Sequence, residues 1–197
     1  VVNNVINARG SGPTATRYSY GIYHTTNAAY RKLAITNNTL SGGEGSYRYA
    51  IVLAGAIDAL HDVRIANNVL FTNVGGSNSY AINRTTTTGI IKRVENNLFT
   101  NAGTYLNSGT AYTTLSSMET YLTGVGTVAA LNKEVTTAAD LYFQDYAAGD
   151  WRPTASSPLG LTQGGRDTSG DDWGAATTDR LGNPRTLLFS IGAYEQD

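Results

Sequence analysis

Four pairs of adjacent asparagines recur through the first half of this 197-residue chain at a nearly constant interval. The pairs lie between short apolar stretches and are spaced by 34, 30 and 29 residues. A second marker, in which a small residue stands between Tyr and Ile, keeps step with them. The pairs are Asn3-Asn4, Asn37-Asn38, Asn67-Asn68 and Asn96-Asn97, and the triplets are Tyr20-Gly21-Ile22, Tyr49-Ala50-Ile51 and Tyr80-Ala81-Ile82. Two markers on one period indicate stacked structural repeats of about 30 residues.

Each repeat contains short apolar runs broken by Asn, Gly and Ser, which is the pattern of three short β-strands joined by turns. In the repeat that begins with the second triplet, at Tyr49, we expect strands over 49–54, 62–66 and 69–72. Charged residues make up only 15% of the chain, which also contains 22 glycines and 13 tyrosines, a composition that suits β-rich extracellular proteins. The sequence therefore predicts an all-β fold, namely a right-handed parallel β-helix (solenoid) with a short helix and an irregular C-terminal cap.

The asparagine pairs are expected to turn the chain between the second and third strands, because asparagine tolerates the left-handed backbone conformation. Stacked repeats would align the pairs into a structural ladder of side-chain hydrogen bonds. The ladder is expected to contain Asn4, Asn38, Asn68 and Asn97. Apolar columns on either side should form the core. One contains Val1, Ile35, Ile65 and Val94, and the other contains Ile6, Leu40, Leu70 and Phe99.

From Thr104 onward the markers disappear and the charge balance reverses. Residues 1–103 contain nine Lys and Arg against four Asp and Glu, whereas residues 104–197 contain five against eleven. The apolar residues Leu115, Met118 and Leu122 predict a short amphipathic helix within 113–122 that covers the open end of the solenoid. We expect β-helix coils over 1–103, and a final coil with a C-terminal cap over 104–197, in one structural domain.

Five short motifs follow one another in the second half. They are Phe143-Gln144-Asp145, Gly149-Asp150-Trp151-Arg152, Ser156-Ser157-Pro158, Asp179-Arg180-Leu181-Gly182-Asn183-Pro184-Arg185 and Ile191-Gly192-Ala193-Tyr194-Glu195. In this order they resemble the C-terminus of pectin-lyase-like right-handed β-helix proteins, including the choice-of-anchor surface proteins. The resemblance implies polysaccharide lyases and glycosidases as relatives. One departure is that the family's usual "S-P-A-I-D-x-G" box lacks its aspartate here.

Catalytic groups are not evident on the expected outer faces. A lyase needs a base and a cation beside the uronate, and a hydrolase needs two carboxylates roughly 5 to 10 Å apart. We expect Asp58 and Asp62 to be solvated turn acids, and His24 and His61 to be surface or strand-end residues. The expected outward neighbours of the inward isoleucines are Gly21, Tyr23, Ala50, Val52, Ala81 and Asn83. Catalytic residues are therefore unassigned, and we expect no catalysis within this segment.

Ligand binding is better motivated. Arg64 and Arg93 occupy equal repeat positions and should lie above one another outside the second strand, with Lys32 and Lys92 near its start. Such a column suits the spaced anionic groups of an acidic polysaccharide, and the alternative is a solvated basic face. Tyr23, or the column of Tyr20, Tyr49 and Tyr80, would stack on sugar rings if it faced outward, whereas aligned aromatics in a solenoid usually form packing ladders.

Calcium is the cofactor that the sequence brings into question. Asp167, Asp171 and Asp172, with Asp179 beyond them, offer oxygen ligands to a hard cation. However, dense Asp and Gly usually mark turns in which a carboxylate accepts hydrogen bonds from local N–H groups, and the spacing matches no EF-hand loop. We favour the turn interpretation and expect no cofactor.

The leading hypothesis is a secreted or cell-surface β-helix module, non-catalytic in this segment, for adhesion, glycan contact or architecture. The alternatives are a polysaccharide lyase or glycoside hydrolase with its active site partly upstream, and a filament subunit that self-associates through the open N-terminal coil. The composition predicts no disulfide, no membrane span and no nucleic-acid partner. Because residues 1–6 resemble the middle of a repeat, we expect a fragment or a processed product.

Overall fold

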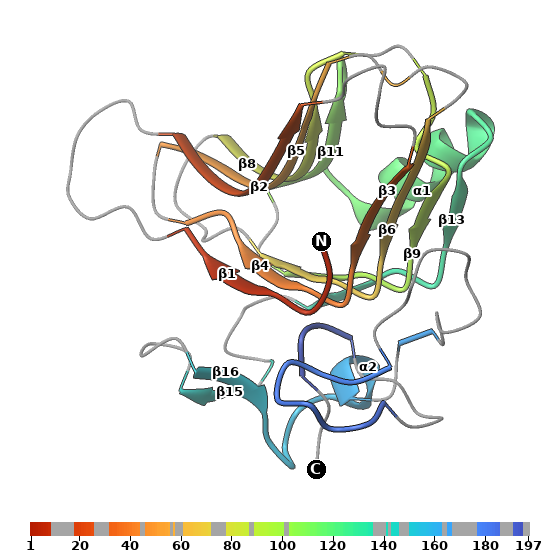
Figure 1. The fold of residues 1–197 in the computed structure, drawn as a ribbon. Coiled ribbons are helices and arrows are strands. Elements are labelled where there is room, and N and C mark those ends of the chain that lie inside the picture. The colour runs from red at the N-terminus through yellow and green to blue at the C-terminus, as the bar shows by residue number, and fades with distance from the viewer. Residues whose placement is uncertain are drawn as a thin grey trace.

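A computed structural model describes residues 1–8, 18–25, 32–43, 46–55, 57, 61–71, 78–86, 89–100, 103–135, 141, 143–145, 150–162, 165–166, 177–185 and 191–194. Short strands dominate this part of the chain (Figure 1). The elements are β1 (Val5–Asn7), β2 (Tyr18–Thr25), β3 (Lys32–Thr36), β4 (Thr39–Ser41), β5 (Tyr47–Ala54), β6 (Asp62–Ala66), β7 (Val69–Phe71), β8 (Asn78–Arg84), β9 (Arg93–Glu95), β10 (Leu98–Thr100), β11 (Thr104–Ser108), β12 (Ala111–Tyr112), α1 (Leu115–Gly124), β13 (Val128–Ala130), β14 (Lys133–Val135), β15 (Phe143–Asp145), β16 (Asp150–Pro153) and α2 (Leu159–Thr162). No helix among the described residues has the length and apolar character needed to span a bilayer.

Strands one repeat apart in the sequence pair in parallel and build three sheets (Figure 1). Sheet 1 contains β2, β5, β8 and β11, with the antiparallel β12 at its edge; sheet 2 contains β3, β6, β9 and β13; sheet 3 contains β1, β4, β7, β10 and β14. The chain visits sheets 1, 2 and 3 in turn and then begins the next coil. The expectation of an all-β fold with parallel sheets is therefore confirmed.

Equivalent residues of successive repeats lie directly opposite one another. Ile51 pairs with Ile22 and Ile82 in sheet 1, and Ile65 pairs with Ile35 and Val94 in sheet 2. The column of Ile6, Leu40, Leu70 and Phe99 is confirmed in sheet 3. The side chains of the inner columns form one buried cluster between the three sheets, so the repeat fixes the core.

The first asparagine of each pair turns the chain from sheet 2 to sheet 3 in the left-handed conformation. The φ angles are 57° at Asn3, 55° at Asn37 and Asn67, and 51° at Asn96. In the last coil Leu131 takes the same conformation, with a φ of 56°. Such a backbone costs a residue other than glycine or asparagine about 1–2 kcal/mol, so the asparagines recur where the turn needs them.

The second asparagine of each pair forms a directional ladder through the core. Asn68 Nδ2 donates to Asn97 Oδ1 at 2.9 Å, while Asn68 Oδ1 accepts from Asn38 Nδ2 at 3.0 Å and from the Asn38 backbone N–H at 3.1 Å. Asn4 begins the series as a donor to Asn38, and Asn97 continues it by donating to Asn132. Asn38, Asn68 and Asn97 therefore each link their own coil to both neighbours.

A helix closes the ladder in the last coil. Asn132, which the repeat did not reveal, donates from Nδ2 to Val94 O at 2.8 Å and to Glu119 Oε1 at 2.9 Å. Glu119 belongs to α1, whose Met118 and Leu122 are buried in the core between the sheets. The expected helix is present; it begins at Leu115 after an N-cap at Thr114, and it lies against β11, β12 and β13.

The outer face of sheet 3 is apolar and is covered by the C-terminal segment, which lies below that sheet in Figure 1. Phe71 meets the Trp151 ring edge-on, with the ring centroids 4.7 Å apart. The buried cluster also contains Val69, Leu98, Leu141, Leu161 and Ile191. Sheet 3 therefore lies between two apolar layers, the core on its inner face and the C-terminal segment on its outer face.

The terminal Ile191-Gly192-Ala193 motif docks directly on the coils. Gly192 donates its N–H to Asn67 O at 2.8 Å and has a φ of 102°. A Cβ at Gly192 would lie 2.8 Å from Thr39 Oγ1 and 3.0 Å from Val69 Cγ2, so only glycine fits. The motif thus fixes the end of the C-terminal segment against sheet 3.

Replacing a central rung of the ladder is expected to be strongly destabilising. Asn68→Ala removes five buried hydrogen bonds of the Asn68 side chain and takes the acceptor from the Asn38 backbone N–H, which should lower the free energy of unfolding by about 3 kcal/mol. Asn4→Ala removes fewer bonds at a half-buried end and should cost about 1 kcal/mol. Urea denaturation measures both losses. Equal losses would contradict a cooperative role of the central rungs.

Candidate functional site

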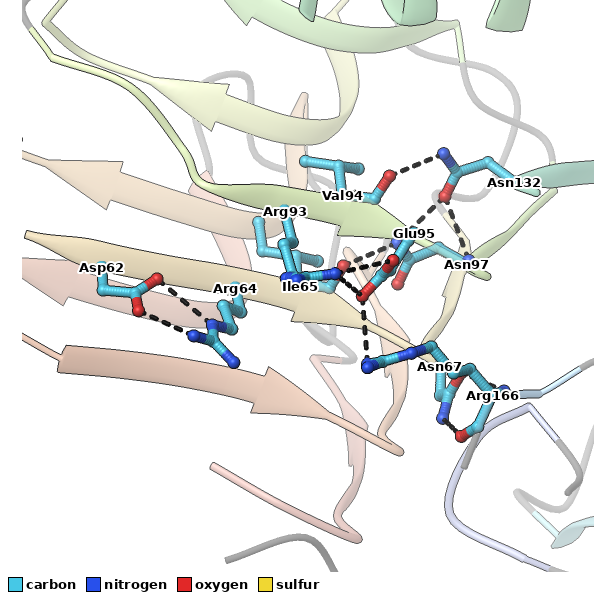
Figure 2. A network of polar contacts seen from close by, with 10 residues as sticks. All are labelled: Asp62, Arg64, Ile65, Asn67, Arg93, Val94, Glu95, Asn97, Asn132 and Arg166. Atoms are coloured by element: carbon cyan, nitrogen blue, oxygen red, sulfur yellow. Dashed lines mark hydrogen bonds and ion pairs between the residues drawn. The ribbon is translucent and has the colours of Figure 1, made fainter. Parts of the chain in front are cut away.

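The outer face of sheet 2 carries the two arginines that the repeat aligned. Arg64 and Arg93 are directly paired in register on β6 and β9. Each is bound by an acid two residues away on its own strand (Figure 2). Both carboxylate oxygens of Asp62 accept hydrogen bonds from Arg64. Arg64 Nη2 donates to Oδ2 at 2.9 Å, and Arg64 Nε donates to Oδ1 at 3.2 Å. The arginine column is therefore already engaged by carboxylates of this chain.

Glu95 joins the coils to the C-terminal segment. Its carboxylate, only 8% exposed, accepts from Arg93 Nη1 at 3.3 Å and from Arg166 Nη1 at 3.2 Å. The side chain of Asn67 forms two hydrogen bonds with the main chain of Arg166 (Figure 2). Its Nδ2 donates to Arg166 O at 2.6 Å, and its Oδ1 accepts from the Arg166 N–H at 2.8 Å. This network, which we call the Glu95 network, contains Glu95, Arg93, Arg166 and Asn67 and fastens the cap to sheets 2 and 3.

The remaining predicted binding residues do not form one site. Lys32 and Lys92 are exposed, and Lys32 lies in register with Asp62 on the outer side of sheet 2. Tyr23, in contrast, lies on β2 of sheet 1. The structure therefore separates the basic column from the tyrosine, and it gives sheet 2 a mixed-charge surface in which acids alternate with bases.

Tyrosines gather on the outer side of sheet 1. Tyr20, Tyr49 and Tyr80 stack in one row with ring centroids 5.3 and 5.2 Å apart, and Tyr18 stacks on Tyr47 at 4.6 Å. Tyr18 and Tyr23 are 54% and 55% exposed, and Tyr20 is 37% exposed. We call this surface the tyrosine face; it consists of Tyr18, Tyr20, Tyr23, Tyr47, Tyr49 and Tyr80. Its inner members are a packing ladder, and its β2 members present aromatic surface to solvent.

A bend in the strands of sheet 1 brings two columns of this face together. Ala50 and Ile51 are consecutive yet both belong to the core, while Tyr49 and Val52 on either side belong to the outer cluster. The expectation that Ala50 and Ala81 point outward is therefore wrong, since both are fully buried in the core. At the bend of β2 a Cβ on Gly21 would lie 2.6 Å from Ala50 O, so glycine is required. The bend places the Tyr23 ring 5.2 Å from Tyr20 in an edge-on contact.

Two phenols of the tyrosine face, those of Tyr49 and Tyr20, have a raised pKa and so hold their protons more tightly than a free tyrosine. Burial, followed by the neighbouring Tyr80 and Tyr20, raises the pKa of Tyr49 to about 12 from its usual 10.0. Burial, followed by Tyr23 and Tyr18, also raises the pKa of Tyr20. These side chains are therefore neutral hydroxyl groups throughout the physiological range.

The residues considered for metal binding or catalysis do not assemble into a site within the described part. Asp167, Asp171 and Asp172 lie outside the described residues, as does Asp58. Asp179 Oδ1 accepts from the N–H groups of Leu181 and Asn183, both at 2.8 Å, so it caps a turn. His61 is buried. The partial burial of His24, and after it the nearby His61, lower the pKa of His24. Among the described residues, no three His, Asp or Glu side chains gather closely enough to hold a metal.

Comparison with known proteins yields no relative. No protein-family model, no curated protein and no solved structure matches the chain. The resemblance to pectin-lyase-like proteins thus stays an expectation from the motifs.

Neutralising Glu95 is expected to loosen the cap. Glu95→Gln removes the charge that binds two guanidinium groups and should lower the free energy of unfolding by about 1.5 kcal/mol. The matched control is Asp150→Asn, which breaks the exposed pair with Arg152 and should change it by less than about 0.5 kcal/mol. Thermal denaturation compares the two. A loss at Asp150 as large as that at Glu95 would contradict the assignment.

Alkaline pH is expected to destabilise the tyrosine face. Because the pKa of Tyr49 lies above its unfolded value of 10.0, the folded chain retains a proton that the unfolded chain loses, and stability falls as pH rises from 10 to about 12. Tyr49→Phe should make this decline shallower. Urea midpoints measured across that range, with phenolate absorbance recorded in parallel, test the expectation. A stability that is flat across it would show that Tyr49 titrates normally.

Proposed function

We propose that this chain is a non-catalytic right-handed parallel β-helix module of a secreted or cell-surface protein, and that it contacts carbohydrate through the tyrosine face. The observation that carries the proposal is the exposed aromatic surface of Tyr18, Tyr20 and Tyr23 on β2, backed by stacked tyrosines on β5 and β8. Contiguous exposed aromatics on a rigid sheet are a common mark of an interaction surface.

The β-helix assignment is supported by the order in which the chain visits the sheets. Parallel partners in each sheet are one coil apart, and two other sheets intervene in every connection. Connections between parallel strands are right-handed in about 98% of cases, because the strand twist favours that hand. A solenoid of this kind gives each outer face a regular spacing of roughly 4.8 Å between equivalent side chains, which suits extended polymers better than small ligands.

The chemistry of the tyrosine face favours an uncharged glycan. The outward columns are uncharged: Tyr18, Tyr47 and Asn78; Tyr20, Tyr49, Tyr80 and Thr104; Tyr23, Val52, Asn83 and Asn107. Aromatic rings offer apolar surface to the C–H face of a sugar, while phenol and amide groups hydrogen-bond its hydroxyls. Asn107 already donates to Asn83 at 2.8 Å, so these amides are held in place. These three columns themselves supply no charged side chain to pair with a charged glycan.

An acidic polysaccharide on sheet 2 is the second candidate. It is favoured by the register of Arg64 over Arg93 and by the exposed Lys32 and Lys92. Binding there would compete with Asp62 and Glu95, which already occupy the guanidinium groups. Exchanging a carboxylate partner of an arginine for an anionic group of the glycan would contribute little to the free energy of binding. The tyrosine face is therefore the stronger candidate.

Polymerisation through the coil ends is less well supported than carbohydrate contact. A second copy that stacked end to end would place its Asn4 Oδ1 against Asn132 as a hydrogen-bond acceptor. Both N–H groups of Asn132 are already donated, to Val94 O and to Glu119. Helix α1 therefore opposes the filament alternative at this end.

Glycan binding tests the proposal directly. Calorimetric titration should detect binding to neutral β-glucan or mannan, and Tyr23→Ala should weaken it roughly tenfold, equivalent to about 1.4 kcal/mol. Tyr23→Phe keeps the ring and should stay within about twofold, while Arg64→Ala is the control on sheet 2.

Three outcomes would contradict the proposal. Binding confined to polygalacturonate or alginate and lost in Arg64→Ala would move the function to sheet 2. Unsaturated product from these uronate polymers would establish a lyase. No binding to any of these polymers would favour a purely architectural role.

A further inference from the structure

The six rings of the tyrosine face form one connected network. Every ring has at least one neighbour whose centroid lies between 4.6 and 6.3 Å away. The contacts join Tyr18 to Tyr20 and Tyr47, Tyr20 to Tyr23 and Tyr49, and Tyr49 to Tyr80. Aromatic rings in such close contact exchange an electron readily. A radical formed on one of these phenols therefore has a path to each of the others.

The composition directs oxidation of this chain to tyrosine. The chain contains 13 tyrosines, one methionine and no cysteine. Met118 is fully buried and Trp151 is 1% exposed, so the thioether and this indole are shielded from an oxidant in solution. Trp173 lies outside the described residues. In contrast, Tyr18 and Tyr23 are 54% and 55% exposed, which makes their phenols accessible to a one-electron oxidant.

Tyr18 and Tyr47 are the closest pair of rings on the tyrosine face. They lie opposite one another in register on β2 and β5. Their centroids are 4.6 Å apart and their planes differ by 15°, so the two rings overlap face to face. A bond between ring carbons of the pair therefore needs only a local movement of the side chains. Tyr18 has room for that movement because more than half of it is exposed.

We propose that the tyrosine face is a site of oxidative cross-linking, at which a haem peroxidase with hydrogen peroxide joins Tyr18 to Tyr47 as dityrosine. Each phenol loses one electron and its hydroxyl proton, and the two radicals form one C–C bond between carbons ortho to the oxygens. The hydrogens of those carbons then pass to the oxygens, which restores both hydroxyl groups. Hydrogen peroxide takes up the two electrons and two protons and becomes two water molecules.

The cross-link would covalently join the first two coils of a chain that contains no cysteine for a disulfide. It depends on the contacts between the rings and not on what the tyrosine face binds. The inference is therefore independent of the glycan proposal.

Tyr112 and Tyr121 provide an internal comparison. Their rings are stacked at 4.5 Å with planes 21° apart, between β12 and α1. Among the described residues no third ring contacts this pair. Two oxidation events must therefore fall on these same two rings, whereas on the tyrosine face two events on any of six rings suffice, since the radicals move to the closest pair. The cross-link should form mainly at Tyr18 and Tyr47.

Oxidation of the full chain with a haem peroxidase and limiting hydrogen peroxide tests the proposal. Mass spectrometry of the intact monomer should show the loss of two hydrogen atoms, and peptide mapping should join Tyr18 to Tyr47. Tyr18→Phe keeps a stacked ring but has no phenol, and it should abolish this cross-link. Tyr112→Phe is the matched control and should leave its yield unchanged. Because Tyr18 is largely exposed, Tyr18→Phe should fold with a Tm within about 2 °C of the parent.

Thermal denaturation of the purified cross-linked monomer gives a second measurement. The bond constrains the unfolded chain as a disulfide does, so the Tm should rise by at least about 4 °C over the unoxidised monomer. Three results would overturn the proposal: a cross-link mainly between Tyr112 and Tyr121, covalent dimers without the link inside one chain, or oxidised tyrosines without dityrosine. An unchanged Tm would contradict a link between successive coils.

Discussion

The buried asparagine ladder is the interaction on which the rest of this structure depends. Each amide between Asn38 and Asn97 accepts from the coil before it and donates to the coil after it, so that one side chain fixes the register of three coils. A slip by one residue would leave these amides unpaired in the core, and buried unpaired polar groups are costly. Register, apolar columns and tyrosine stacking all follow from that constraint.

The three sheets have different outer faces, and this division of roles leads to the functional proposal. Sheet 3 is covered by the C-terminal segment through Trp151 and its apolar neighbours. On sheet 2, Arg64 and Arg93 form ion pairs with acids of their own strands. One of these acids, Glu95, also binds Arg166 and so holds the C-terminal segment in place. Among the described residues, it is sheet 1 that combines exposed aromatic rings with uncharged polar columns. Carbohydrate contact is therefore proposed for the tyrosine face, whose β2 members Tyr18, Tyr20 and Tyr23 are exposed.

The repeat predicted the strands and most of the core columns, because one period with two markers fixes which residues stack. The prediction that Val1 belongs to the core is wrong, since Val1 is 49% exposed. It missed Asn132, since the preceding position holds Leu131 and the pair is broken there. It also missed the bond between Asn67 and Arg166, which joins residues 99 apart and leaves no local pattern. The pairs Asp62–Arg64 and Arg93–Glu95 did leave a signal, because residues two apart on a strand share a face. The sequence also predicted that Ala50 would face outward, because side chains alternate along a strand. The bend places both Ala50 and Ile51 in the core.

Amide hydrogen exchange followed by NMR tests the ladder most directly. The backbone N–H groups of Asn38, Asn68 and Asn97 each donate to the asparagine Oδ1 of the next coil at 3.1 Å. The account predicts that these three amides are among the slowest in the chain and exchange together, through global unfolding. Rapid or independent exchange of the three would show that the coils open singly, and it would contradict the ladder as the element that holds them in register.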